Sequence, residues 1–462
     1  MHLHFLGICG TFMGSLAQLA KSAGHQVSGC DDNVYPPMST QLQKAGIDLI
    51  EGFDPAQLNP APDLIVVGNA LSRGNPCVEY ILDQKLPYIS GPQWLGDNFL
   101  KDKHVISVSG THGKTSTSSM LAKILDSADY NPGYLIGGVP QDFGISARLG
   151  GTAPDGNHYF VIEADEYDTA FFDKRSKFVH YHSDCLIINN LEYDHADIFD
   201  DLAAIQRQFH HCVRILPSNG NLIYPANDSA VLEVIDRGCW SHKQSFGTAN
   251  ANWQYQLLSE DGSQFEIIHA NSNQRGTISW QQSGLHNVNN ALAAVVAANQ
   301  VGVNLKQACE ALSLFIGIKR RMEPIYSERN LTVYDDFAHH PTAIKTTLEG
   351  LRAKVGDAQI VAGIEPRSAT MKLGVHQGEL ASSVVSADQV LWYQNASIDW
   401  DLSAVAKDAG IAVSVNSHIH SLVKETLEII SDNHRANQST HIVIMSNGSF
   451  EGFHQRVLEQ LK

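Results

Sequence analysis

Short apolar runs alternate with amphipathic stretches along most of the chain, which predicts strands alternating with helices. The first apolar run, 2–8, predicts a buried strand, and Leu16, Leu19 and Ala20 predict the buried face of the helix that follows. Further strands are predicted at 26–29, 63–67 and 87–90. This order is typical of a Rossmann-like domain built on a parallel sheet.

Predicted strands and helices alternate again after a charged stretch at 101–103. An apolar run at 104–108 predicts a strand, and a helix follows it with apolar side chains at helical spacing. Two more buried strands are predicted at 159–162 and 185–188. A second α/β domain is therefore expected to begin at His104.

Between residues 220 and 282 the pattern changes to short strands and turns. A strand is predicted at 221–224, and the turn signal Asp261-Gly262 separates predicted strands at 255–258 and 265–269. Residues 277–280 resemble a third antiparallel strand. We expect a β-rich annex on the central sheet, followed by an alanine-rich helix over about 288–299.

A third segment returns to alternating strands and helices. Strands are predicted at 331–334, 359–362, 389–393 and 441–445, with helices near 341–354, 419–432 and 452–461. The predicted fold is therefore α/β in three domains: Rossmann-like over 1–103, central with the annex over 104–317, and Rossmann-like over 318–462.

Composition narrows the range of partners. The chain has 462 residues and a formal net charge of −17. Its hydrophobic fraction of 43% is typical of a globular protein. Such an acidic chain is not expected to bind nucleic acid or an anionic membrane through bulk charge. The seven cysteines are scattered and never spaced C-x-x-C, so they predict neither a disulfide framework nor a zinc site. With no apolar run near 18 residues and no leader pattern, we expect a soluble, cytoplasmic protein without membrane insertion.

The junction of the 104–108 strand and the next helix carries a glycine turn that ends in Lys-Thr. Gly110 and Gly113 allow the backbone to approach a phosphate, and the helix beginning near Lys114 directs free N–H groups towards it. Lys114 is expected to neutralise phosphate oxygens and Thr115 to bind Mg²⁺. Val108 stands where the longer form of this motif has glycine, so an ordinary strand–helix turn with a surface lysine is the alternative.

Acidic and polar clusters follow the next two strands. Four acids occur in the six residues that begin at Glu163, and His195 lies in the cluster after 185–188. Strand ends of a doubly wound sheet meet at one edge, so these groups are candidate magnesium ligands beside the phosphate loop. A solvated acidic loop and a loop histidine are the alternatives.

Two other patterns also indicate nucleotide contacts, but they are less specific than the phosphate-loop motif. The first loop has the spacing G-x-x-G-x-x-x-G and precedes a strand ending in Asp31, which allows diphosphate binding or merely tight packing of helix on strand. Asn287 and Asn290 are three apart, so they share a helix face and can bind adenine or ribose, although Asn287 alone can also be a helix cap.

Taken together, these motifs resemble the Mur ligase family, the ATP-dependent amide-forming enzymes of peptidoglycan synthesis. The resemblance covers the whole chain and rests on motifs that occur in the family's order: Gly110–Thr115, Glu163, Asp194-His195, His286-Asn287, Asn290, 319–321 and Asp335-Asp336. It implies ATP as a substrate and two Mg²⁺ sites. It also implies three domains that close over a cleft.

The resemblance also implies roles for particular residues. Lys114, Glu163, His195, Arg321 and Asp335 would be catalytic, and Thr115, Glu163 and His195 would bind metal. The implied ATP-binding residues are Gly110, Thr111, His112, Gly113, Lys114, Thr115, Ser116, Asn287 and Asn290. The implied residues for the UDP-sugar are Gly7, Gly10, Thr11, Gly14, Asp31 and Ser72, and those for the acceptor are His339 and Arg367.

Within the family, three stretches resemble the branch that works in peptidoglycan recycling: 7–14, 365–372 and 446–454. That branch joins UDP-N-acetylmuramate to the tripeptide L-alanyl-γ-D-glutamyl-meso-diaminopimelate through an acyl phosphate. No lysine lies between Lys177 and Lys243, so the segment after His195 cannot supply the carbamylated lysine that some members use. The oligomeric state is not predicted.

Four other functions are alternatives to this one. The nearest is the same chemistry with free L-alanine as acceptor. Folylpolyglutamate-type ligation leaves the first domain without a use, and an NAD-dependent dehydrogenase leaves Lys114, Glu163 and Arg321 unexplained. A nucleotide-gated binding protein without catalysis is a further alternative.

Overall fold

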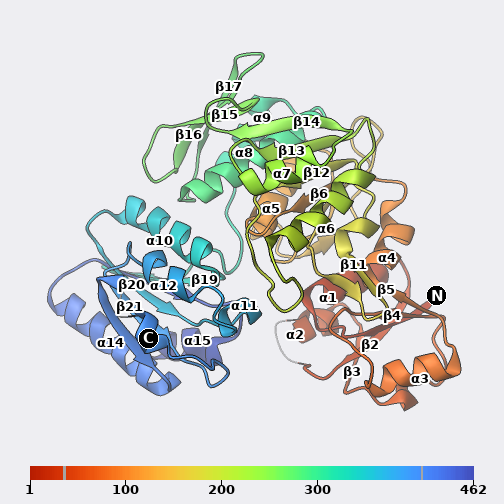
Figure 1. The fold of residues 1–462 in the computed structure, drawn as a ribbon, viewed down its shortest axis with the longest axis horizontal. Helices are drawn as coiled ribbons and strands as arrows, with labels where there is room; N and C mark the ends of the chain where they lie inside the picture. The colour runs from red at the N-terminus through yellow and green to blue at the C-terminus, as the bar shows by residue number, and fades with distance from the viewer. Residues whose placement is uncertain (35–37, 407–408, 462) are drawn as a thin grey trace.

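The computed structural model describes residues 1–34, 38–406 and 409–461. They form three α/β units, each on its own sheet, and the C-terminal unit lies beside the other two (Figure 1). The predicted three-domain α/β fold is confirmed; the domain boundaries stay a prediction. In the part of the chain described, no helix combines the length and apolarity needed to cross a membrane.

The N-terminal sheet is entirely parallel. Its strand order is β3 (Asp48–Glu51), β2 (Gln26–Asp31), β1 (His2–Leu6), β4 (Leu64–Val67) and β5 (Tyr88–Ser90). Its helices are α1 (Thr11–Ser22), α2 (Met38–Lys44), α3 (Pro76–Gln84) and α4 (Gly91–Leu95). The first glycine loop therefore connects β1 to the N-terminus of α1.

The central sheet has ten strands. Their order is β17 (Gln274–Ser279), β16 (Gln264–His269), β15 (Trp253–Leu257), β14 (His242–Gly247), β13 (Asn221–Pro225), β12 (Cys185–Ile188), β6 (His104–Ser109), β9 (Tyr159–Glu163), β7 (Gly133–Leu135) and β8 (Ala147–Arg148). A separate hairpin is formed by β10 (Asp168–Ala170) and β11 (Asp173–Ser176). The central helices are α5 (Lys114–Ser127), α6 (Leu202–Ile215), α7 (Ser229–Asp236), α8 (Leu285–Gln300) and α9 (Leu305–Ser313).

The expected annex continues the central sheet. β13, β14 and β15 run parallel to β12, and only β16 and β17 add antiparallel pairs. The pattern missed β14 because its first half, His242 to Gln244, is polar and only its end is buried. Helix α8 begins at Leu285, three residues before the predicted start, directly after Gly284 with φ +91°.

The C-terminal sheet is parallel apart from one edge strand. Its order is β18 (Glu323–Glu328), β19 (Leu331–Asp336), β23 (Thr440–Met445), β20 (Gln359–Ile364), β21 (Gln389–Tyr393) and β22 (Ala412–Asn416), and β18 pairs antiparallel with β19. Its helices are α10 (Pro341–Val355), α11 (Ala369–Lys372), α12 (Gln377–Ser383), α13 (Leu402–Ala406), α14 (Ile419–Arg435) and α15 (Phe453–Leu461).

The three units differ in how their cores connect. One apolar cluster runs from Phe5 and Leu16 in the N-terminal unit through Trp94 to Phe160 and Phe209 in the central unit. The C-terminal sheet instead has apolar clusters of its own on its two faces. Among the described residues, the apolar clusters of the C-terminal unit are separate from those of the other two units. The C-terminal unit is therefore the one expected to move relative to the others.

The helix after the phosphate loop is anchored by the largest of these cores. Leu121 lies on α5, is fully buried and packs in the cluster that joins α5 to α8. Leu121→Ala is expected to lower the free energy of unfolding of the central unit by about 2–5 kcal/mol, because it leaves a cavity. Calorimetric unfolding would measure this, with the exposed Ser127→Ala on the same helix as control. Equal transitions in the two variants would contradict the packing described here.

Candidate active site

A cleft of about 1000 Å³ lies between the central and C-terminal units. Its central wall comes from the loops after β6, β9 and β12 and from the start of α8, and its other wall comes from β19 and α10. The predicted site residues that line it are Thr111, His112, Gly113, Lys114, Thr115, Ser116, Glu163, Asn287, Asn290, Arg321 and His339. The fold therefore gathers most of the predicted ATP site in one place.

The phosphate loop has the backbone that the glycines predict. Gly110 and Gly113 have φ of +124° and +81°, and α5 begins at Lys114. A Cβ on Gly110 would lie 2.9 Å from the Asn190 carbonyl oxygen, so no larger residue fits there. A Cβ on Gly113 would overlap the Asn290 side chain, so Asn290 packs directly against the loop. The free N–H groups at the start of α5 thus open on the cleft.

The Lys114 ammonium lies inside this loop. Its Nζ donates to the Gly110 carbonyl at 2.6 Å and lies 3.5 Å from Glu166 Oε2. Burial acts to lower the pKa of Lys114, but the nearby carboxylates, Glu166 first, outweigh it and raise the pKa. The lysine therefore stays charged in a nearly water-free place, where its attraction for a phosphate oxygen is strong.

Thr115 and Glu163 meet beside the lysine. The Thr115 hydroxyl donates to both carboxylate oxygens of Glu163, at 3.0 and 3.1 Å, and Gly137 N–H donates to Glu163 Oε2 at 2.7 Å. Hard oxygen donors of this kind are those that Mg²⁺ prefers. The hydroxyl and the carboxylate at the edge of the phosphate loop therefore have the chemistry of Mg²⁺ ligands.

His195, expected to share a metal ion with Glu163, lies against Glu166 in this structure. Its Nε2 lies 3.0 Å from Glu166 Oε1, and its Nδ1 lies 2.7 Å from the Tyr167 hydroxyl. Burial acts to lower the pKa of His195, but the hydrogen bond to Glu166 raises it overall. Both ring nitrogens are thus engaged in this structure, and His195 does not contact the Thr115–Glu163 pair.

Glu166 is the functional candidate that sequence reasoning did not single out. It is 2% exposed, and although burial favours its neutral form, Lys114 and His195 lower its pKa to about 2. It was one of four acids in the 163–168 cluster, and no sequence period distinguished the buried acid from the solvated ones. The sequence feature that could have pointed to Glu166 is its position three residues after the end of β9.

On the opposite wall, Arg321 lies over the Phe337 ring, with 4.9 Å between its guanidinium carbon and the ring centroid. Burial lowers the pKa of Arg321, and the Asp336 carboxylate opposes that shift. Asp336 lines the cleft and accepts hydrogen bonds from the N–H groups of Met322 and Ala338, each at 2.8 Å.

Asp335, the acid predicted for catalysis, is not among the residues that line this cleft. It pairs with Arg320 at 3.5 Å and with His454 at 3.0 Å. Asp335 thus does not lie on the cleft with Arg321, because successive β19 residues face opposite sides of the sheet and Asp336 is on the side of the cleft.

The two asparagines predicted to contact the nucleotide, Asn287 and Asn290, make different hydrogen bonds. Asn290 Oδ1 accepts a hydrogen bond from Thr117 Oγ1 at 3.2 Å, which ties α8 to α5 behind the phosphate loop. Asn287 Nδ2 donates to the Ser283 carbonyl at 2.8 Å and lines the cleft near its mouth. Their geometry leaves Asn287 the freer of the two for a nucleotide contact.

The residues predicted to hold the UDP-sugar lie outside this cleft. Gly7, Gly10 and Thr11 follow β1. Asp31 ends β2, and its carboxylate accepts from Cys9 N–H at 3.0 Å and from Asn33 N–H at 3.1 Å. The predicted set is completed by Gly14, where a Cβ would overlap the Met38 side chain, and by Ser72, which is exposed in the loop after β4. Both alternatives for the first glycine loop thus find support: helix packing at Gly14 and an open strand-end loop at Gly7 to Thr11.

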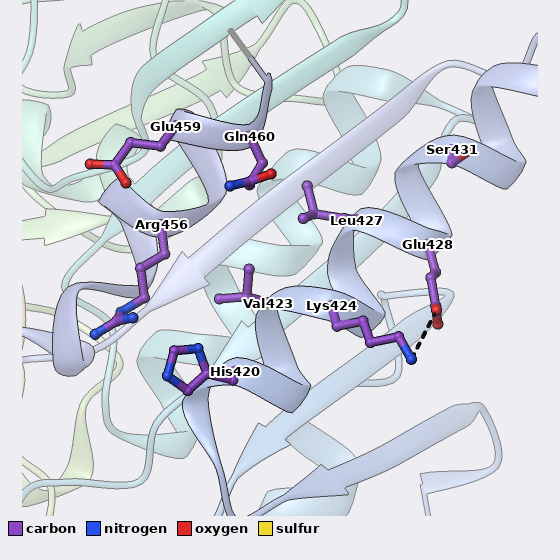
Figure 2. A pocket seen from close by; sticks show the side chains of 9 residues that line it. All are labelled: His420, Val423, Lys424, Leu427, Glu428, Ser431, Arg456, Glu459 and Gln460. Carbon is purple, nitrogen blue, oxygen red and sulfur yellow. Dashed lines mark ion pairs between the residues drawn. The ribbon is translucent and has the colours of Figure 1, made fainter.

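The two predicted acceptor contacts are separated. His339 lines the cleft, with its Nδ1 2.9 Å from the Phe337 carbonyl. Arg367 follows β20 and packs closely over Gly448, outside the lining of the cleft. Another groove, on the C-terminal unit, runs between α14 and α15 and is lined by residues such as Val423, Leu427 and Arg456 (Figure 2). None of the predicted site residues line that groove.

Comparisons with known proteins decide the family. Three family models match in order: the Mur ligase family catalytic domain over residues 2–102, the Mur ligase middle domain over 108–298 and the Mur ligase glutamate ligase domain over 320–448. A ligase of Haemophilus influenzae is 49% identical over 462 residues, which cover 100% of this chain and 99% of the relative. The chain belongs to the Mur ligase family.

The relatives carry informative names. The Haemophilus protein is the UDP-N-acetylmuramate–L-alanyl-γ-D-glutamyl-meso-2,6-diaminoheptandioate ligase. The crystal structure of a murein peptide ligase from Psychrobacter arcticus is 50% identical, with a TM-score of 0.77 over 100% of this chain and 98% of that one. A UDP-N-acetylmuramate–L-alanine ligase of Acetivibrio thermocellus is 33% identical over 76% of this chain and 73% of the relative. The resemblance drawn from the motifs, to this family and its recycling branch, is confirmed.

Buried histidines on the cleft predict how stability depends on pH. Burial lowers the pKa values of His286 and His339 to about 4, whereas an unfolded histidine titrates near ~6.5. The unfolded chain therefore binds more protons below that value, so stability is full above about pH 6.5 and falls as the pH drops towards 4.

Replacing one of these histidines should reduce that dependence. Between pH 7 and pH 5, the free energy of unfolding of His339→Asn is expected to fall by about 2 kcal/mol less than that of the parent. Urea unfolding at the two pH values would measure it, with the exposed His242→Asn as control. An identical loss in His339→Asn and the parent would show that this histidine is not held neutral.

Proposed function

We propose that this protein is an ATP-dependent ligase that joins UDP-N-acetylmuramate to L-alanyl-γ-D-glutamyl-meso-diaminopimelate in peptidoglycan recycling. The observation that carries the proposal is identity near one half along the full length of a ligase with these substrates in its name and of a murein peptide ligase. The phosphate loop and its acids supply chemistry that fits it. Free L-alanine as acceptor is less favoured, because the alanine ligase is less similar and matches less of the chain. The dehydrogenase alternative has no support among these relatives.

The reaction must first activate a poor electrophile. A carboxylate gains a good leaving group when it takes the terminal phosphoryl group of ATP, and the resulting acyl phosphate is open to attack by the amine of the tripeptide. Lys114, inside the phosphate loop, is placed to hold the charge of the transferring group together with the N–H groups of α5. The bond made is an amide, and phosphate leaves.

Acidic and polar side chains beside the phosphate loop are the proposed metal ligands. We propose two Mg²⁺ sites, one with Thr115 and the other with Glu163 and His195. Magnesium supplies charge neutralisation to the phosphoryl group when bound. His195 would have to leave Glu166 to bind an ion, and Glu166 would then keep Lys114 in place through the remaining ion pair. Glu166 is thus proposed as a positioning residue.

The C-terminal unit supplies the other half of the site. Arg321 and His339 face the phosphate loop across the cleft, and the unit has its own core. Closure would bring Arg321 to the phosphoryl group and exclude water from the acyl phosphate. Asp336 would orient Arg321 during that approach. Arg367 remains proposed for a carboxylate of the peptide, where a bidentate pair is favoured.

The first domain remains proposed for the UDP portion. Its open loop at Gly7 to Thr11 ends at the N-terminus of α1, which favours a diphosphate. Asp31 would act by shaping that loop, because its oxygens accept hydrogen bonds from Cys9 and Asn33. We expect the enzyme to act in the cytoplasm, where ATP is available.

Loss of the lysine or of the metal-binding acid should abolish turnover. Lys114→Ala and Glu163→Ala are each expected to lower kcat by at least ~10³-fold, because they remove charge stabilisation that is strongest in the transition state. Steady-state release of ADP and phosphate would measure it. The exposed Lys243→Ala and Glu260→Ala remove the same charges elsewhere and should leave kcat unchanged. Near-normal turnover in Lys114→Ala or Glu163→Ala would remove the assigned role.

A panel of acceptor amines tests the reaction itself. With ATP, Mg²⁺ and UDP-N-acetylmuramate present, the tripeptide should release ADP at a kcat/KM at least ~10²-fold above that with free L-alanine, since an acceptor site built for a peptide gains from contacts that alanine lacks. Equal or better use of alanine would instead favour the alanine-adding reaction. ADP release with no acceptor dependence would overturn both.

A further inference from the structure

Three side chains from separate loops meet where the central and C-terminal units face each other. His112 belongs to the phosphate loop, Glu192 follows β12 and His340 precedes α10. His112 Nε2 lies 3.1 Å and His340 Nδ1 lies 3.5 Å from the same Glu192 oxygen, Oε2. Across the ranges that the structure describes, this is the group of three potential ligands whose donor atoms all lie within 4.8 Å of one another.

These spacings are those of a metal coordination shell. Zinc binds imidazole nitrogen and carboxylate oxygen at about 2.0–2.2 Å with tetrahedral angles, which places two ligand atoms roughly 3.3 Å apart. The observed separations of 3.1 and 3.5 Å lie on either side of that value. Glu192 and either histidine are therefore already spaced for one ion, and the three donor atoms all lie within 4.8 Å of one another.

The His340 nitrogen that faces Glu192 also caps α10. The N–H of Thr342 donates to His340 Nδ1 at 3.3 Å. A ring nitrogen has one lone pair, so an ion bound at Nδ1 would take the place of this long hydrogen bond. Glu192 Oε2 receives the Thr342 hydroxyl at 2.7 Å, and a carboxylate oxygen has a further lone pair for an ion.

His340 is also oriented from behind. Its Nε2 lies 3.2 Å from His376 Nε2, and His376 Nδ1 lies 3.2 Å from Glu379 Oε1. Histidines that bind metals are usually held through the second ring nitrogen in this way, which fixes the ring and its tautomer. His340 is 3% exposed, so few alternative orientations are open to it.

We propose that His112, Glu192 and His340 bind a divalent transition-metal ion of the zinc class, separate from the magnesium sites. Two imidazoles and one carboxylate select Zn²⁺, Co²⁺ or Ni²⁺ over Mg²⁺, which prefers oxygen donors. Three protein ligands leave one coordination position for water or another donor in the cleft. The ion would link the phosphate loop to α10 and so hold the C-terminal unit against the central one.

The test uses Co²⁺ as a spectroscopic substitute for Zn²⁺, added to the full-length, nucleotide-free protein in excess Mg²⁺. One equivalent should give the visible bands of a four-coordinate site without a thiolate charge-transfer band, which rules out the cysteines as ligands. His340→Ala and Glu192→Gln should weaken Co²⁺ binding by at least tenfold, and His376→Ala should weaken it by about tenfold through the lost orientation. Zn²⁺ should displace the Co²⁺ in competition.

Matched controls locate the ion. The exposed His242→Ala and the magnesium-site His195→Ala should bind Co²⁺ as the parent does. If His340→Ala unfolds, as judged by circular dichroism, His112→Asn tests the same site from the central unit. The proposal is overturned if the parent takes up no stoichiometric Co²⁺, if His112→Asn and every folded variant of the cluster bind it unchanged, or if His195→Ala abolishes binding.

Discussion

A buried carboxylate, Glu166, lies between Lys114 and His195, and much of the catalytic arrangement depends on it. It joins a loop that follows β6 to a loop that follows β12, although the acid itself comes from the chain beyond β9. Removing one member of such a buried group would leave an uncompensated charge, which is strongly destabilising. The same carboxylate favours the charged form of Lys114 and holds one nitrogen of the His195 ring.

The two walls of the cleft belong to units that are packed differently against the rest of the protein. The N-terminal and central units share an apolar core, whereas polar contacts join the C-terminal unit to the central loops. Thr370 donates to Asp194 at 2.6 Å and Thr342 donates to Glu192 at 2.7 Å. When polar contacts of this kind separate, their groups can form hydrogen bonds with water, whereas a shared apolar core would be exposed.

The loop at 190–197 links these two observations. Asn190 supports the phosphate loop through the N–H of His112, at 2.8 Å, while Glu192 and Asp194 contact the C-terminal unit. His195, in the same loop, has φ +57°, a conformation that costs energy for a histidine. One segment thus contacts both the predicted phosphate loop and the C-terminal unit.

Sequence alone was sufficient wherever function depends on local backbone. Gly110, Gly113 and Lys114 define a loop whose shape follows from a strand, two positive φ values and a helix start, so the shape of this loop could be predicted. The α/β rhythm was equally clear, because buried parallel strands are continuous apolar runs. Polar strands such as β14 were missed, because their place in the sheet comes from neighbouring strands.

Tertiary structure alone decided which of several equivalent acids and histidines meet. Asp335 and Asp336 are adjacent in sequence and chemically identical, and only the facing of β19 puts Asp336 on the cleft. Glu166 became distinct from its acidic neighbours through burial between two cations, and His112, Glu192 and His340 came together from loops that are far apart along the chain. The physical reason is that charge and ligand geometry depend on distances in space, whereas a sequence pattern records only distances along the backbone.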